Sequence, residues 1–129
     1  MSTLEERLRS LRDGRLLLAA LVSADALSPA LRDLAAGALQ RYPDDQAIHH
    51  RLRGTEAIQA LAWGEALAAT RTLIEALMER RPGDDPWRQW ARGVDRHFPE
   101  ARYLPSGITS CERWSAAFLD PWVGLESGS

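Results

Sequence analysis

Residues 55–80 carry more apolar surface than a helix with one neighbour needs. At about 100° per residue, two sets of apolar side chains fall on two sides of one predicted helix, roughly a quarter to a third of a circle apart. The first set is Ile58, Ala62, Ala66, Ala69, Leu73 and Leu77, and the second is Trp63, Leu67, Ile74 and Met78. The narrow polar strip that remains consists of Glu65, Arg71, Thr72, Glu75 and Glu79. Such a helix is either central to a domain or lends one stripe to another chain.

Local start signals predict two helices before this segment. Thr3 and Glu6 have capping-box spacing, which predicts a helix over residues 4–23. Gly14 lies inside that helix, where glycine costs about 1 kcal/mol relative to alanine, but the apolar stripe keeps its phase across it. Ser28 precedes a proline, a pairing typical of an N-cap and the first helical position, so a second helix begins there.

The second helix must end at Pro43, and a short third helix is predicted after it. Asp44 and Asp45 are placed to cap this helix, which would end near Gly54. No alternating strand pattern occurs in the chain, so an all-helical fold is expected.

Seven of the nine aromatic residues lie between Trp87 and Trp122. Trp87, Trp90 and Phe98 keep helical phase after a cap-and-proline start at Asp85 and Pro86, which predicts a helix to about residue 98. Helical phase makes these three rings candidates for the core.

A second capping box, Thr109 with Glu112, predicts a last short helix whose aromatic face includes Cys111. Together these patterns predict an all-α fold: a compact bundle of five to six helices around one long central helix, with aromatic-rich C-terminal helices. We expect a single domain over residues 1–123 and a disordered tail over residues 124–129.

Composition excludes several chemistries. Apolar residues make up 45% and charged residues 26% of the 129 residues, as in ordinary globular domains. All sixteen basic residues are arginine, so a P-loop, Schiff-base or kinase lysine is excluded. A single cysteine forms no internal disulfide and is too little for a structural zinc site. No apolar run reaches the ~18 residues that span a bilayer, so a cytoplasmic location without membrane contact is expected.

Charge gives little support for nucleic-acid binding. The net charge is −2, and the residues up to Gly64 balance eight arginines against eight acids, while the rest has eight against ten. A basic face that would attract phosphates is therefore not expected.

Cys111 is the sharpest catalytic candidate. It stands at the start of a predicted helix, where backbone amides stabilise a thiolate, and His97 is the nearest histidine that would serve as its base. The alternative is that Cys111 is a small core residue, since it shares a face with Trp114 and Phe118. A reactive Cys111 would indicate a cysteine-dependent enzyme or redox sensor. We favour the interpretation that Cys111 belongs to the core.

Metal and cofactor sites are not predicted. His49 and His50 are adjacent on a helix and point about 100° apart, so they cannot chelate one ion from the same face. A small-molecule pocket between helices is a further alternative, with four aromatic residues as its lining. These are Trp87, Trp90, Trp114 and Phe118.

The leading hypothesis is a small non-enzymatic protein that binds another protein, as an adaptor, an inhibitor, or an antitoxin-like or immunity-like factor. It rests on the second apolar stripe of residues 55–80 and on the aromatic C-terminal end. The predicted partner-binding residues are Trp63, Leu67, Ile74, Met78, Tyr103 and Trp122. The first four are also the predicted homodimer contact, while Tyr103 and Trp122 are the aromatics that helical packing does not explain.

Overall fold

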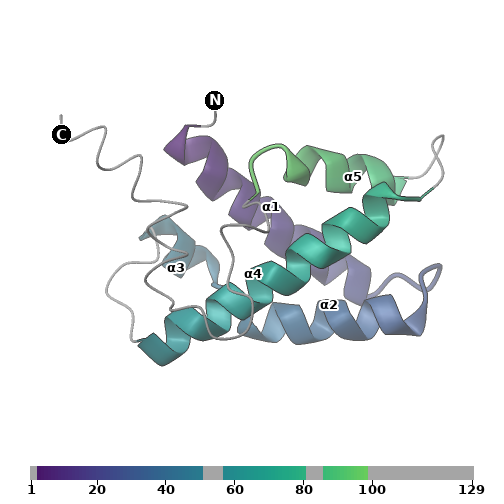
Figure 1. Cartoon of the computed structure of the whole chain (residues 1–129), viewed down its shortest axis with the longest axis horizontal. Coiled ribbons are helices and arrows are strands. Elements are labelled where there is room, and N and C mark those ends of the chain that lie inside the picture. The colour runs from purple at the N-terminus through teal and green to yellow at the C-terminus, as the bar shows by residue number, and fades with distance from the viewer. Residues whose placement is uncertain (1–2, 51–56, 81–85, 99–129) are drawn as a thin grey trace.

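The computed structural model describes residues 3–50, 57–80 and 86–98, and these segments form helices and no strand (Figure 1). In chain order the helices are α1 (Leu4–Val22), α2 (Pro29–Arg41), α3 (Asp45–His49), α4 (Ala57–Met78) and α5 (Pro86–Asp95). The all-α fold class is thus confirmed for the described part of the chain. The predicted last helix after Thr109 and the predicted tail over residues 124–129 lie outside it, and the domain limits stay a prediction.

Side-chain caps begin the first three helices, as their sequence signals indicate. The Thr3 hydroxyl accepts the Glu6 N–H and the Glu6 carboxylate accepts the Thr3 N–H, both at 3.1 Å, which completes the capping box. The Ser28 hydroxyl accepts a hydrogen bond of 3.3 Å and the Asp44 carboxylate one of 2.7 Å, each from the backbone N–H three residues on. These bonds satisfy amides that a helix start leaves without an intrahelical partner.

Two helices are shorter than predicted. The helix α3 stops at His49 rather than near Gly54. The helix α5 stops at Asp95, but the Phe98 N–H still donates to the Val94 carbonyl at 3.1 Å. This turn keeps Phe98 on the buried side although the regular helix has ended.

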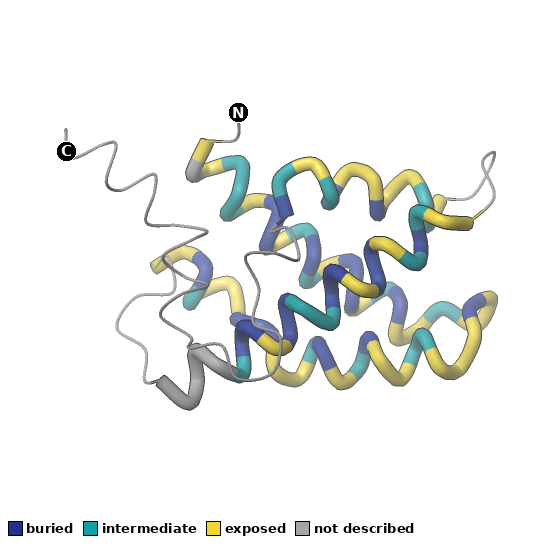
Figure 2. The backbone as a smooth tube through the Cα atoms, viewed as in Figure 1, coloured by how far each residue is buried: buried dark blue, intermediate teal, exposed yellow. Residues whose placement is uncertain are grey.

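The longest helix, α4, crosses the bundle between α2 and α5 (Figure 1). The helix α1 packs against α2, α3 and α5, so α5 rests on both α1 and α4. Figure 2 shows the buried residues of α1, α2 and α4 on the sides that face one another. The core therefore lies between helices that are far apart in the sequence.

Each apolar stripe of α4 has members that are buried within the chain. From the second stripe, Leu67 and Ile74 are 0% exposed and Trp63 is 8% exposed, and from the first stripe Leu73 and Leu77 are also buried. The sequence leaves open whether the second stripe packs inside the chain or against another chain. These residues pack inside the chain, because α2 and α5 flank α4 on two sides. The predicted contact of Trp63, Leu67 and Ile74 with a partner is corrected accordingly, and homodimerisation itself stays a prediction.

Gly14 is the point of closest approach in the core. An ideal Cβ at this position would lie 2.6 Å from the Tyr42 hydroxyl oxygen and 2.9 Å from Phe98 Cε2. At such distances a side chain at Gly14 would force Tyr42 or Phe98 to shift, so glycine lets the ends of α2 and α5 meet closely on α1. This close packing explains why a glycine stands inside α1 despite its low helix propensity.

Candidate functional site

The helix α5 presents one face to the core and the other to solvent. Ala91, Val94 and Phe98 are buried, and Trp87 packs partly buried against the same core. On the opposite face the exposed residues are Gln89, Arg92, Gly93 and Arg96. At 100° per residue, Trp90 and His97 fall on one flank of this outer face, while Arg88 and Asp95 fall on the other.

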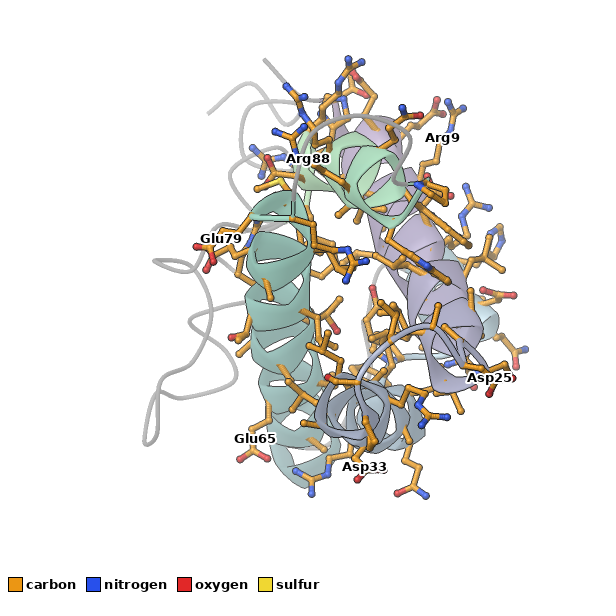
Figure 3. All side chains as sticks on the ribbon, turned by 90° about the vertical axis from the view of Figure 1, so that its right-hand side faces the viewer. Arg9, Asp25, Asp33, Glu65, Glu79 and Arg88 are labelled. Atoms are coloured by element: carbon orange, nitrogen blue, oxygen red, sulfur yellow. The ribbon has the colours of Figure 1, made fainter. Side chains whose placement is uncertain are left out.

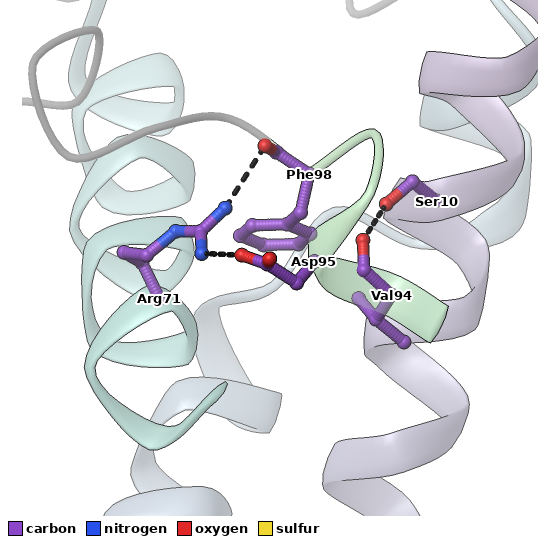
Figure 4. Close-up of polar contacts among 5 residues, drawn as sticks. All are labelled: Ser10, Arg71, Val94, Asp95 and Phe98. Atoms are coloured by element: carbon purple, nitrogen blue, oxygen red, sulfur yellow. Dashed lines mark hydrogen bonds and ion pairs between the residues drawn. The ribbon is translucent and has the colours of Figure 1, made fainter. Parts of the chain in front are cut away.

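Polar contacts tie α5 and its C-terminal turn to α1. The buried Ser10 hydroxyl donates to the Val94 carbonyl at 2.8 Å (Figure 4). His97 Nε2 lies 2.9 Å from a carboxylate oxygen of Glu6. The hydrogen bonds of the Thr3 backbone and side chain lower the pKa of Glu6, and the nearby His97 lowers it further. Glu6 therefore joins the start of α1 to the end of α5.

A buried arginine ties the other flank of α5 to α4. The Arg71 guanidinium pairs with Asp95, donates to the Phe98 carbonyl at 2.9 Å and lies 5.5 Å from the centre of the Phe98 ring (Figure 4). Burial of a cation is costly unless it is paired and hydrogen-bonded, and these contacts supply that compensation. Arg71, expected in the polar strip of its helix, thus helps fix α5.

A second arginine joins the start of α5 to the end of α4. Arg88 Nε donates to the Met78 carbonyl at 3.1 Å. Met78 is the last residue of α4, where carbonyls lack intrahelical partners, so this bond caps that helix. With the contacts of Ser10, His97 and Arg71, it fixes α5 on both flanks.

Trp90 is the exposed aromatic residue of α5. Its side chain is 37% exposed, and its ring stacks on the Trp87 ring with centroids 5.9 Å apart and planes 5° from parallel. Since Trp87 packs against the core, the stack holds Trp90 in one orientation at the surface. The prediction that helical phase makes Trp90 a core residue is wrong, because Trp90 lies at the edge of the apolar face.

A groove of about 770 Å³ lies on the other side of the outer face, between α5 and the end of α4. It is lined by Met78, Arg88, Gln89, Arg92, Gly93, Asp95 and Arg96. Figure 3 shows nitrogen-tipped side chains gathered around Arg88 at this end of the molecule, while Glu79 points away from α5 in the same view. The lining thus contains one apolar side chain, Met78, and three arginines.

The three arginines of the lining form a strip, one helical turn apart: Arg88, Arg92 and Arg96. Arg92 and Arg96 are exposed, and neither has an ion pair with any residue of the ranges that the structure describes. The acid in the groove lining, Asp95, is paired with Arg71 and does not offset this charge. An anionic group in the groove would find the guanidinium donors of Arg92 and Arg96.

The sequence prediction missed this arginine strip. Over each half of the chain, acids elsewhere cancel the charge of the three arginines, so a charge balance at that length does not reveal them. The spacing of i, i+4 and i+8 within one predicted helix is the signal that finds it.

The other predicted site residues divide into described and undescribed ones. Met78 is half-buried and contributes to the groove, whereas His97 is engaged with Glu6. The remaining five predicted residues lie outside the described residues: Tyr103, Cys111, Trp114, Phe118 and Trp122. The pairing of His97 with Cys111 and the pocket of four aromatics therefore stay predictions.

His49 and His50 are both exposed, with ring centroids 5.4 Å apart and planes at 72°. In the described ranges, no three histidine, cysteine, aspartate or glutamate residues are grouped as a metal would require. The same ranges contain no helix with the length and apolar character needed to cross a membrane.

Comparisons with models of known protein families, with curated proteins and with solved structures found no match to this chain.

Proposed function

We propose that this chain is a small protein-binding module and that its partner contacts the outer side of α5. The observation that carries the proposal is the exposed Trp90 ring, stacked on the anchored Trp87 ring. Tryptophan and arginine are enriched among the residues that dominate binding energy at protein interfaces. Here Trp90 lies on one flank of the outer face, and the arginine strip runs from the other flank, at Arg88, onto the outer face itself.

Rigidity of this helix supports the same function. Ser10 and Glu6 hold α5 from α1, while Arg71 and the Met78 carbonyl hold it from α4. A surface whose side chains are already ordered loses less conformational freedom when a partner binds. Trp90 is thus presented as a preorganised anchor.

The proposal also includes the predictions that the described residues do not reach. The predicted loop before the last helix would add Tyr103 and the segment after that helix would add Trp122 to the aromatic end of the molecule, and the partner contact would extend over them. A role as adaptor, inhibitor, antitoxin-like or immunity-like factor in the cytoplasm, with or without homodimerisation, belongs to this proposal.

The test is a quantitative affinity capture from the native host with the full chain and two matched variants. Trp90→Ala removes the exposed ring of α5, and Leu16→Ala removes an apolar side chain that is 61% exposed on α1. We expect a protein that is retained by the wild type and by Leu16→Ala and is lost with Trp90→Ala. Equal recovery by all three folded proteins would contradict the proposed surface.

Two further variants define the extent of the surface. Tyr103→Ala and Trp122→Ala are captured in parallel, with mass spectrometry of the retained proteins. Loss of the same partner as with Trp90→Ala would place both residues in one interface. Full recovery with these two variants would restrict the interface to α5.

A further inference from the structure

We infer that the groove between α4 and α5 binds an extended acidic peptide segment, with carboxylates at alternate positions, through the exposed guanidinium groups of Arg92 and Arg96. This inference rests on the proposed protein-binding function and names the chemistry of the partner. The Trp90 surface and the groove flank the outer face of one helix, so one partner can contact both.

The spacing of the arginines sets the spacing of the carboxylates. Arg92 lies in α5 and Arg96 in the turn that follows it, and residues four apart along such a helical path rise about 6 Å. In an extended peptide, alternate side chains point to the same side and lie about 6.7 Å apart. Two acids at alternate positions therefore match these two guanidinium groups closely enough for one contact each.

The electrostatics of the groove favour carboxylates. Arg92 and Arg96 are exposed and have no ion pair within the described ranges, and Asp95 is committed to Arg71. A guanidinium presents its donors as a planar fork that matches a carboxylate with two parallel hydrogen bonds. Two neighbouring acids of the peptide would each gain such a partner.

The floor of the groove has room for the peptide backbone. An added Cβ at Gly93 would meet nothing within 4 Å, so this position is open. Met78 and the methylene stems of the arginines supply apolar surface beneath the charges. An extended segment fits such an open groove better than a helix, whose diameter with side chains is about 10–12 Å.

The charge of the whole chain favours a peptide over a nucleic acid. Its net charge is −2, which at longer range repels a polyanion more strongly than a peptide with a few acids. Affinity for a phosphate backbone grows with the number of phosphates that basic side chains neutralise, and a strip of three arginines neutralises few. A short acidic segment needs only the local positive charge.

The test is fluorescence anisotropy of a labelled nine-residue peptide with glutamates at three alternate positions, titrated with the full chain. The control peptide carries glutamine at those positions, and a nine-nucleotide single strand is titrated in parallel. We expect saturable binding of the glutamate peptide, weakened by salt, and at least about tenfold weaker binding of the glutamine peptide.

Matched charge reversals test the site. Arg92→Glu and Arg96→Glu are each expected to weaken the glutamate peptide about tenfold or more, because a guanidinium contact is lost and a repulsion is added. Arg12→Glu makes the same change at an exposed position of α1 and should leave the affinity within about twofold, since screening weakens distant charges. Circular dichroism of each variant confirms that it is folded, and Arg92→Gln repeats the test without a reversed charge.

Several results would overturn the inference. These are no peptide binding by the folded wild type, equal binding of the glutamate and glutamine peptides, equal weakening by Arg12→Glu and Arg92→Glu, and tighter binding of the oligonucleotide. The two proposals fail separately. Loss of the captured partner with Trp90→Ala but not with Arg92→Glu would keep the proposed function and reject the groove, and the reverse pattern would reject the Trp90 surface.

Discussion

The Tyr42 hydroxyl donates a 2.5 Å hydrogen bond to the Leu11 carbonyl, in the middle of α1. This buried bond lies directly over Gly14, where a side chain would collide with the same hydroxyl and with the Phe98 ring. Because Phe98 also receives the Arg71 hydrogen bond, the glycine, the tyrosine and the C-terminal turn of α5 form one packing unit. The position of the candidate surface thus depends on a contact in the core.

The first prediction concerns the glycines. Gly14→Ala should destabilise the fold by about 1–3 kcal/mol, because overpacking outweighs the better helix propensity of alanine. Gly37 and Gly93 have nothing within 4 Å of an added Cβ, so alanine at either should stabilise the fold by up to about 1 kcal/mol. Urea unfolding of the three variants measures this, and a Gly14→Ala protein as stable as the other two would refute the packing account.

The second prediction is a coupling between Gly14 and Tyr42. Tyr42→Phe alone should cost about 1 kcal/mol, the net worth of one hydrogen bond. In a Gly14→Ala background the same change should cost less, because it removes the oxygen that the new methyl group approaches most closely. A double-mutant cycle measures the coupling, and additive effects would show that Phe98 alone sets the limit.

The third prediction concerns alkaline pH. Burial raises the pKa of Tyr42 well above its ordinary value of 10.0, and Asp13 raises it while Arg15 lowers it. In the unfolded chain the phenol ionises near its ordinary pKa, whereas the folded protein retains the proton. The stability that depends on neutral Tyr42 is therefore complete below about pH 10 and decreases as the pH rises above it.

The chain suits this measurement because it contains no lysine to titrate in the same range. The free energy of unfolding, followed between pH 9 and 11.5, should decrease more steeply for the wild type than for Tyr42→Phe. Cys111 and Tyr103 are present in both proteins and contribute equally to the comparison. Parallel curves for the two proteins would show that Tyr42 is not the group responsible.

Local signals in the sequence predicted the helix starts well. Thr3, Ser28 and Asp44 cap the helices as expected, because a cap and the amides that it bonds lie within three residues of each other. The end of α5 was predicted less well. Its last turn is shaped by Arg71, which is 27 residues from the Phe98 carbonyl that it binds.

The candidate surface was only partly predictable for the same reason. Periodicity showed that α4 has two apolar stripes, but which chain covers Leu67 depends on how α2 and α5 pack, and no local pattern specifies this. Arg71 counts as a surface residue by its type, yet Asp95 and the Phe98 carbonyl allow it to be buried. Trp90 has helical phase with Trp87, but its position at the edge of the stripe leaves it exposed.

The last prediction concerns the ion pair that fixes α5. The Arg71 side chain is 7% exposed and the Asp95 side chain is 37% exposed, so the two partners are not equivalent. Asp95→Ala leaves a buried cation without its counter-charge and should destabilise the fold by about 2–3 kcal/mol. Arg71→Met leaves a carboxylate that water already reaches and replaces the cation with an apolar chain, so it should cost less.

Urea unfolding of both variants and of the double variant measures the difference. Glu65→Ala is the matched control, because it breaks an exposed pair with Arg41 that spans the same 24 residues of sequence and should cost less than about 1 kcal/mol. If Arg71→Met were the more destabilising change, the hydrogen bond to the Phe98 carbonyl rather than the charge pair would be the main attachment of α5 to α4. In that case the difference in free energy of unfolding between the wild type and the Asp95→Ala protein would not change with salt concentration.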